Sequence, residues 1–152
     1  MLKAIDIMTP NPVTLSPETD IRTAATLLLE RKINGAPVVD AQGKLVGVLC
    51  QSDLVAQQKQ VTLPSVFALL DGFIALSSRD DFEREIKKIA ATKVAEAMTP
   101  DPHTVSPQTP IDEIATVMVN EKLFTLPVVD GGRLVGVVGK EDILRTLLGH
   151  KP

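Results

Sequence analysis

Apolar residues recur at helical spacing in two separate stretches of the chain. The spacing i, i+3, i+4, i+7 is typical of a helix that buries one face, so both stretches predict an amphipathic helix. Thr19 and Thr109 precede the two stripes and are expected to cap these helices, with Pro110 at the first helical position of the second one. The stripes are Ile21, Ala24, Ala25 and Leu28, and then Ile111, Ile114, Ala115 and Met118.

Two short valine-rich runs follow each predicted helix. Gly43 divides the first pair of runs and Gly131-Gly132 divides the second, which predicts a β-hairpin in each stretch. Near the end of each second strand, Asp53 or Asp142 opens a further helix. Each stretch is therefore predicted to form a helix, a hairpin and a helix. The runs are Pro37–Asp40 and Leu45–Leu49, then Val128–Asp130 and Leu134–Val138.

The two stretches are copies of one unit. Met8-Thr9-Pro10 returns as Met98-Thr99-Pro100, 90 residues later, and the run that contains Pro37 returns as the run that contains Pro127 at the same offset. Asp53 then returns as Asp142 at an offset of 89, because one residue is deleted between the strands of the second copy. We call residues 1–56 copy one and residues 94–152 copy two. Because their strands are apolar on both faces, the copies are expected to pack sheet to sheet.

The Thr-Pro and Ser-Pro steps at the start of each copy predict an irregular lead-in. Residues 57–93 form an insertion between the copies, with apolar positions at 66–74 and 82–90 that predict two short helices. Three of the four Phe residues lie in this insertion. This insertion is expected either to pack against the two copies or to form a surface for an oligomer or a partner protein.

Composition narrows the possible classes of protein. The chain has 152 residues, of which 44% are hydrophobic and 3% aromatic, so any core is aliphatic. The net charge of −3 argues against a nucleic-acid-binding protein. One cysteine, Cys50, allows no internal disulfide framework and suits a reducing compartment, and His103 and His150 have no metal-ligand spacing. Asp6 interrupts the start, and no run of 18 apolar residues occurs, so a cytoplasmic protein outside membranes is expected.

The ordered pattern Met-Thr-Pro-x-Pro, amphipathic helix, Pro-Val-Val-Asp, Leu-Val-Gly-Val and helix-opening Asp resembles the cystathionine-β-synthase (CBS) domain, in two tandem copies. The resemblance implies an α/β fold of the α+β kind, in which two helix–hairpin–helix motifs pack with pseudo-twofold symmetry. It also implies two clefts that hold AMP, ADP or ATP, less often S-adenosylmethionine or NAD(H). It further implies a homodimer that regulates a separate partner, with no cofactor required.

Through this resemblance the ribose ligands are Asp53 and Asp142. An ionised carboxylate accepts two hydrogen bonds, which matches the two vicinal hydroxyls of a ribose. The alternative is that each Asp only caps its helix. The phosphate-side positions are Cys50, Ser52, Gly139, Lys140 and His103.

The family usually has Ser or Thr three residues before this Asp, where the present chain has Cys50 and Gly139. Glu141 would repel a phosphate in copy two, although Lys140 could offset it. The Asp53 site is therefore expected to be the better nucleotide site, and the Asp142 site to be weak, empty or used by a ligand without phosphate.

The resemblance also implies that the clefts are built crosswise, so that the adenine wall for one Asp comes from the other copy. Phe124 is expected either to stack on the base or to pack in the core. The wall for Asp53 is Thr99, Leu123, Phe124, Thr125 and Pro127, with His103 beside it. The wall for Asp142 is Thr9, Val13, Ile33, Asn34, Gly35 and Pro37.

The sequence contains no nucleophile–base pair, no metal-ligand pattern and no glycine-rich phosphate loop, so an enzyme is not expected. The leading interpretation is a regulatory module that senses an adenosine-containing nucleotide. The alternative is a structural dimerisation module with degenerate, empty clefts, which the missing Ser or Thr before both Asp residues favours.

Overall fold

The computed structural model describes residues 1–56 and 93–149 of the chain. Within these ranges each copy forms a helix, an antiparallel hairpin and a second helix, so the predicted order of elements and the fold class are confirmed. In copy one the elements are α2 (Ile21–Arg31), β2 (Gly35–Val39), β3 (Leu45–Cys50) and α3 (Gln51–Ala56). In copy two they are α7 (Ile111–Glu121), β5 (Thr125–Asp130), β6 (Arg133–Gly139) and α8 (Lys140–Leu147).

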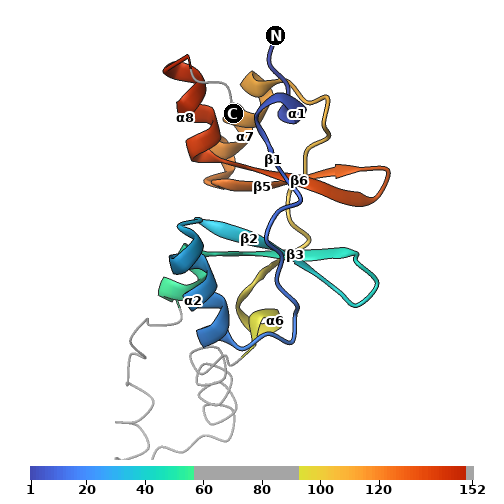
Figure 1. Cartoon of the computed structure of the whole chain (residues 1–152), viewed down its shortest axis with the longest axis vertical. Helices are drawn as coiled ribbons and strands as arrows, with labels where there is room; N and C mark the ends of the chain where they lie inside the picture. Colours follow the sequence, from blue (N-terminus) through green and yellow to red (C-terminus); the bar gives the residue numbers. More distant parts are fainter. Residues whose placement is uncertain (57–92, 150–152) are drawn as a thin grey trace, which may run out of the picture.

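The two sheets lie face to face, with helices α2, α7 and α8 on their outer sides (Figure 1). Strand β5 contacts both β2 and β3 across the junction between the copies. The predicted sheet-to-sheet packing is therefore confirmed. It covers the second apolar face of each hairpin, which one copy alone would leave exposed to water.

Each sheet takes its third strand from the lead-in of the other copy. Strand β1 (Thr9–Pro10) pairs with β6, and β4 (Thr99–Pro100) pairs with β3, each antiparallel. A short helix precedes each of these strands, α1 (Ala4–Ile7) and α6 (Val94–Ala97). The prediction of an irregular lead-in is thus wrong at these positions. A residue before proline prefers the extended conformation, which fits an edge strand, but two residues are too few to show a strand period.

The exchange of lead-ins also exchanges core residues. Ala4 and Ile7, at the start of copy one, are buried with Ile114 and Leu126 of copy two. Val94, at the start of copy two, is buried in the core of copy one. The boundaries predicted at residues 56 and 93 stay a prediction about the sequence units, since each spatial half contains residues of both copies.

Glycines allow the close approach of the exchanged strands. A Cβ on Gly136 would lie 2.6 Å from Met8 Sδ and 2.9 Å from the carbonyl oxygen of Thr9. A Cβ on Gly47 would meet Met98 Sδ at 2.5 Å in the same way. These distances explain the glycine within Leu-Val-Gly-Val in both copies.

The helix caps differ from the prediction. Asp20 is the N-cap of α2, where its carboxylate accepts a hydrogen bond from the backbone N–H of Arg22 at 3.1 Å. Pro110 is the N-cap of α7, one position before the helix rather than inside it. The hydroxyl of Thr109 instead accepts a hydrogen bond from the Ser106 N–H within the preceding turn, and Thr19 does the same for Ser16. The two predicted helices of the insertion lie outside the described residues.

Candidate functional site

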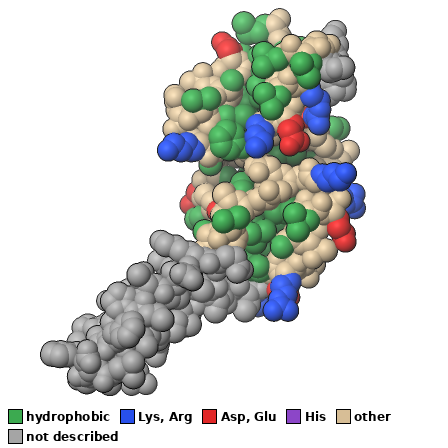
Figure 2. Space-filling view, turned by 90° about the vertical axis from the view of Figure 1, so that its left-hand side faces the viewer, with side chains coloured by type: hydrophobic (Ala, Val, Ile, Leu, Met, Phe, Trp, Pro, Cys, Tyr) green, Lys and Arg blue, Asp and Glu red, His purple; other side chains and the backbone are tan. Residues whose placement is uncertain are grey.

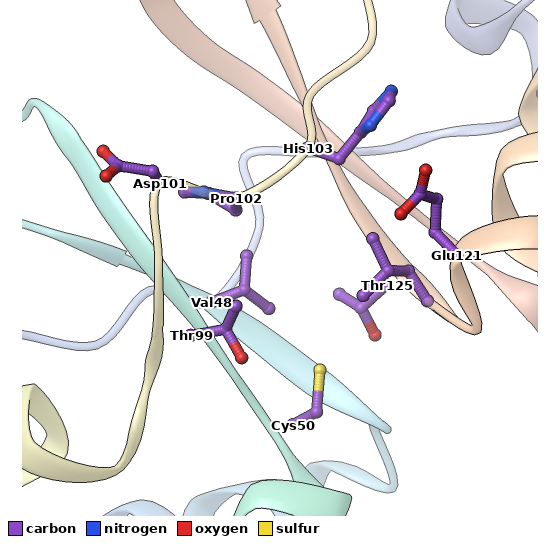
Figure 3. Close-up of a pocket in the computed structure, with 9 residues that line it drawn as sticks. Val48, Cys50, Thr99, Asp101, Pro102, His103, Glu121 and Thr125 are labelled. Atoms are coloured by element: carbon purple, nitrogen blue, oxygen red, sulfur yellow. The ribbon is translucent and has the colours of Figure 1, made fainter.

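Two clefts open at the junction between the copies. The Asp53 cleft is a cavity of about 380 Å³, and Thr99 on its wall has its hydroxyl 3.4 Å from Asp53 Oδ1. Cys50 projects its sulfur into this cavity, while His103 and Glu121 lie at the opposite rim (Figure 3). The lining residues are Val48, Cys50, Thr99, Asp101, Pro102, His103, Glu121, Leu123 and Thr125.

The Asp142 cleft is the counterpart of the first cleft, with a volume of about 230 Å³. It combines the lead-in and the α2–β2 turn of copy one with the β6–α8 junction of copy two. Both clefts are therefore lined by residues of both copies. The lining residues are Thr9, Arg31, Lys32, Ile33, Asn34, Gly35, Thr125, Val137, Gly139, Lys140, Glu141, Asp142 and Arg145.

Asp53 and Asp142 lie in the first turn of α3 and α8, not at the N-cap. Oδ2 of Asp53 accepts a hydrogen bond from the Cys50 N–H at 2.8 Å, and Oδ2 of Asp142 accepts one from the Gly139 N–H at 2.7 Å. Each carboxylate thus stabilises its helix from inside the first turn. Because a carboxylate oxygen has two lone pairs, these bonds leave acceptor capacity for a ligand.

The second oxygen of each carboxylate has a different neighbour. Oδ1 of Asp142 accepts a hydrogen bond from the Arg145 guanidinium at 2.8 Å, which forms an ion pair. Oδ1 of Asp53 has the neutral Thr99 hydroxyl at 3.4 Å. Partial burial is the main cause that raises the pKa of both carboxyls above the ordinary value. Protonation therefore begins to remove their acceptor capacity at a higher pH than it would for an exposed carboxyl.

Cys50 forms part of the wall of the Asp53 cleft. Burial is the main cause that raises the pKa of its thiol to about 11, and the nearby Asp53 carboxylate acts in the same direction. The side chain is therefore a neutral thiol near pH 7, a weak hydrogen-bond donor. This environment matches the interpretation of Cys50 as a small strand residue without a redox role.

Thr125 is the residue that the two clefts share. It is 6% exposed and lines both cavities, and its hydroxyl lies 3.4 Å from the side-chain nitrogen of Asn34. Its counterpart in copy one is Gly35, where a Cβ would lie 3.0 Å from Thr125 Oγ1. One copy thus supplies the side chain and the other supplies the space for it, which places Thr125 between the two cavities.

Most of the sequence-predicted site residues come together in these two cavities. Six predicted residues are absent from both linings: Val13, Pro37, Ser52, Asp53, Phe124 and Pro127. Asp53 borders the first cleft through its contact with the lining residue Thr99 at 3.4 Å. Pro37 and Pro127 are fully buried in their strands. Phe124 is 41% exposed, so the alternative of core packing is wrong, and Lys140 Nζ lies 5.7 Å from the centroid of its ring.

Charged residues at the rims were missed by the sequence analysis. Arg31, Lys32 and Arg145 line the Asp142 cleft, and Asp101 and Glu121 line the Asp53 cleft. A position-by-position comparison of the two copies would have shown a reversal of charge at one pair of these positions. Arg31 and Glu121 occupy the same place in the repeat, 90 residues apart, with opposite charges.

Metal-ligand clusters and membrane-spanning helices are two features that residues 1–56 and 93–149 lack. In these ranges no three His, Cys, Asp or Glu side chains are grouped so that they could hold a metal ion. In the same ranges no helix is long and apolar enough to cross a membrane.

Comparisons with known proteins agree on one family for this chain. The family model of the CBS domain matches residues 4–59 and again residues 94–149. An uncharacterized protein of Methanocaldococcus jannaschii is 31% identical over 151 residues, covering 94% of this chain and 89% of that protein. The chloroplast protein CBSX2 of Arabidopsis thaliana is also 31% identical, and this chain spans 63% of its length.

Solved structures agree with this family in fold. The crystal structure of CBSX2 in complex with AMP superposes with a TM-score of 0.76, at 28% identity and 98% coverage of both chains. The CBS domain pair of protein MJ0100, in complex with 5'-methylthioadenosine and S-adenosylmethionine, superposes with a TM-score of 0.72, at the same identity and coverage.

Proposed function

Because the chain belongs to the CBS domain family and carries two copies of the domain, we propose that it is a regulatory module that senses an adenosine-containing nucleotide and signals to a separate partner protein. The observation that carries the proposal is the pair of clefts in which a carboxylate of one copy faces a wall of the other. The complexes of CBSX2 with AMP and of MJ0100 with S-adenosylmethionine support this class of ligand.

The proposed ligand chemistry follows from the two carboxylates. The vicinal hydroxyls of a ribose donate to Asp53 or Asp142, and hydrogen bonds to a charged group contribute about 1.5–3 kcal/mol each. The backbone carbonyls of Asn34 and Phe124 accept hydrogen bonds from the N–H groups of Gln51 and Lys140, and each keeps a second lone pair for the edge of the adenine. Aliphatic side chains such as Val48 and Val137 supply apolar contact, since no Trp or Tyr is present in the chain.

A ligand that contacts both copies regulates by shifting their relative arrangement. It stabilises whichever arrangement it binds more tightly, and only by its difference in affinity for the two. Thr125 lies against both clefts, so a movement of β5 in response to one ligand alters the wall of the other cleft. The partner protein would bind one arrangement of the two copies more tightly than the other.

Isothermal titration calorimetry with AMP, ADP, ATP, S-adenosylmethionine, 5'-methylthioadenosine and NADH tests the proposal. At least one ligand is expected to bind with a Kd below about 100 μM, or roughly −5.5 kcal/mol. The double variant Asp53→Asn/Asp142→Asn is expected to weaken that binding at least tenfold, because it removes both charged acceptors.

Asp6→Asn is the matched control. Asp6 makes the same backbone hydrogen bond, to the Lys3 N–H at 2.8 Å, but lies in α1 and lines neither cleft. It is expected to leave affinity unchanged. Absence of heat with all six ligands would contradict the sensor and favour the alternative, a dimerisation module with empty clefts.

The helices of both copies carry exposed apolar side chains at equivalent positions, which supports a homodimer as part of the proposal. Leu29 and Val119, 70% and 71% exposed, are counterparts in α2 and α7. Val55 and Leu144, 71% and 53% exposed, are counterparts in α3 and α8. Figure 2 faces this side of the molecule and shows apolar side chains on both halves. A surface repeated by pseudo-symmetry can match a second copy of itself.

Val119→Glu is expected to convert the dimer to a monomer, because it would bury a charge in the apolar contact. Analytical ultracentrifugation measures the change in mass. Ile5→Glu, which places the same charge on an exposed apolar position of α1, is the control and is expected to leave the dimer intact. A monomeric unmodified chain, with or without ligand, would contradict the homodimer.

A further inference from the structure

The two clefts differ in charge, although the repeat makes them equivalent in fold. Four basic side chains and two acidic ones line the Asp142 cleft. Among the described residues, the lining of the Asp53 cleft contains the acidic side chains of Asp101 and Glu121 and no Lys or Arg. The carboxylate of Asp53 lies directly beside this wall. One cleft is therefore basic and the other acidic.

The difference arises from substitutions at equivalent positions of the repeat. Arg31 of the basic cleft corresponds to Glu121 of the acidic one. On the other wall, Arg145 corresponds to Ala56, and Lys140 corresponds to Gln51, each 89 residues earlier. These three changes lie on both walls and make the Asp142 cleft more positive than the Asp53 cleft. They outnumber the one opposite change, in which Glu141 corresponds to Ser52.

We propose that the two clefts select adenosine ligands by charge, so that a phosphate-bearing nucleotide binds in the Asp142 cleft and an adenosine ligand without phosphate binds in the Asp53 cleft. This inference rests on the proposed function and assigns a ligand class to each cleft. It reverses the expectation from the sequence that the Asp53 site is the better nucleotide site.

The Asp142 cleft is suited to an anion despite its two acidic residues. The Asp142 carboxylate is paired with Arg145 at 2.8 Å, which offsets its charge while leaving lone pairs for a ribose. Arg31, Lys32 and Lys140 are exposed at the rim, where a phosphate group can remain partly hydrated. Arginine and lysine form charge-assisted hydrogen bonds with phosphate, and together they outweigh Glu141.

The acidic side chains of the Asp53 cleft disfavour the binding of a phosphate group. Within the described residues, Asp53 forms no ion pair, and its hydrogen-bond partners are the Cys50 N–H and the Thr99 hydroxyl. A phosphate beside Asp53 would face Asp101 and Glu121, and His103 is the one basic residue in the described part of this lining. A neutral or cationic substituent on the ribose avoids this repulsion. The larger volume of this cleft also accommodates an apolar substituent next to Val48 and Leu123.

AMP and 5'-methylthioadenosine test the proposal, because both contain adenosine and only AMP carries a phosphate. Calorimetry on the full chain is expected to give one AMP site per chain. Asp142→Asn is expected to weaken AMP at least tenfold and Asp53→Asn less than twofold, with the reverse order for 5'-methylthioadenosine. AMP affinity is expected to fall with added salt, and affinity for 5'-methylthioadenosine to stay nearly constant.

Replacing the charged side chains at the rims of the two clefts distinguishes selection of ligands by charge from a general effect on folding. Arg31→Glu is expected to weaken AMP at least tenfold while 5'-methylthioadenosine binds as before. Asp101→Asn/Glu121→Arg places copy-one residues in the acidic cleft and is expected to add a second AMP site per chain. These side chains are exposed, so thermal unfolding should stay unchanged in all three positions.

Two results would overturn the charge selection while leaving the proposed function intact. One is AMP binding that is lost in Asp53→Asn and retained in Asp142→Asn. The other is two AMP sites of similar affinity in the unmodified chain. Absence of heat with both ligands and with the remaining nucleotides would instead contradict the proposed function itself, so the two failures can be distinguished.

Discussion

Replacement of Ile7 by alanine is expected to lower the free energy of unfolding by about 2–5 kcal/mol, with its structural damage in copy two rather than in copy one. Ile7 lies near the start of the chain, but its side chain is 1% exposed and packs in one core with Ile114 and Leu126. Truncation to alanine removes buried methyl and methylene groups and leaves a cavity in that core.

Urea unfolding measures the loss, and Ile5→Ala is the matched control. Ile5 belongs to the same short helix α1 but is 51% exposed, so its replacement is expected to change stability by less than about 0.5 kcal/mol. Hydrogen exchange locates the effect, with protection lost in β5 and β6 before β2 and β3. Equal losses for the two variants, or exchange that rises first in copy one, would contradict the packing.

The exchanged lead-ins connect stability to the proposed sensing. Each half of the molecule depends on a strand and a core residue from the other copy, so loss of a lead-in contact is expected to weaken the opposite half first. The same lead-ins carry cleft residues, namely Thr9 for one cleft and Thr99 for the other. A ligand that binds against a lead-in therefore stabilises both the cleft and the sheet to which that lead-in belongs.

The pattern of apolar residues was enough to predict the helix–hairpin–helix units, because their stripes and valine runs extend over many residues. It did not predict the exchange of β1 and β4, since two-residue strands have no period and their partners lie more than 50 residues away. The caps were also assigned to the wrong residues. Thr19 and Asp20 are both good capping residues in sequence, and only the turn at Ser16 decides between them.

The candidate site was predictable to the extent that the family resemblance implied it. The crosswise position of Thr99 beside Asp53 came from that resemblance, and no spacing in the sequence alone would have indicated it. The charged rims could not be assigned in the same way, because Arg31 and Arg145 come from different copies and meet only in the folded cleft. For Phe124 the resemblance indicated a place in the adenine wall that the fold does not give it. Its ring lies near Lys140 Nζ, and it lines neither cleft.

Replacement of Gly136 by alanine is expected to destabilise the protein by about 1–3 kcal/mol and to weaken ligand binding in the Asp142 cleft. A Cβ at this position would lie 2.9 Å from the backbone oxygen of Thr9, so strand β1 would have to move away from β6. Thr9 lines the Asp142 cleft, and its displacement alters the wall that faces the ligand. Urea unfolding and calorimetry measure the two effects.

Gly139→Ala is the control from the same strand. Its added Cβ would have its nearest neighbours at 3.7 Å, an ordinary contact, and the backbone N–H that it donates to Asp142 is retained. This variant is expected to unfold at nearly the same urea concentration as the unmodified chain. Equal stability of the two alanine variants would show that β1 does not depend on a glycine at 136. A loss of stability at 136 without a loss of affinity would show that β1 supports the sheet but does not position the Asp142 cleft.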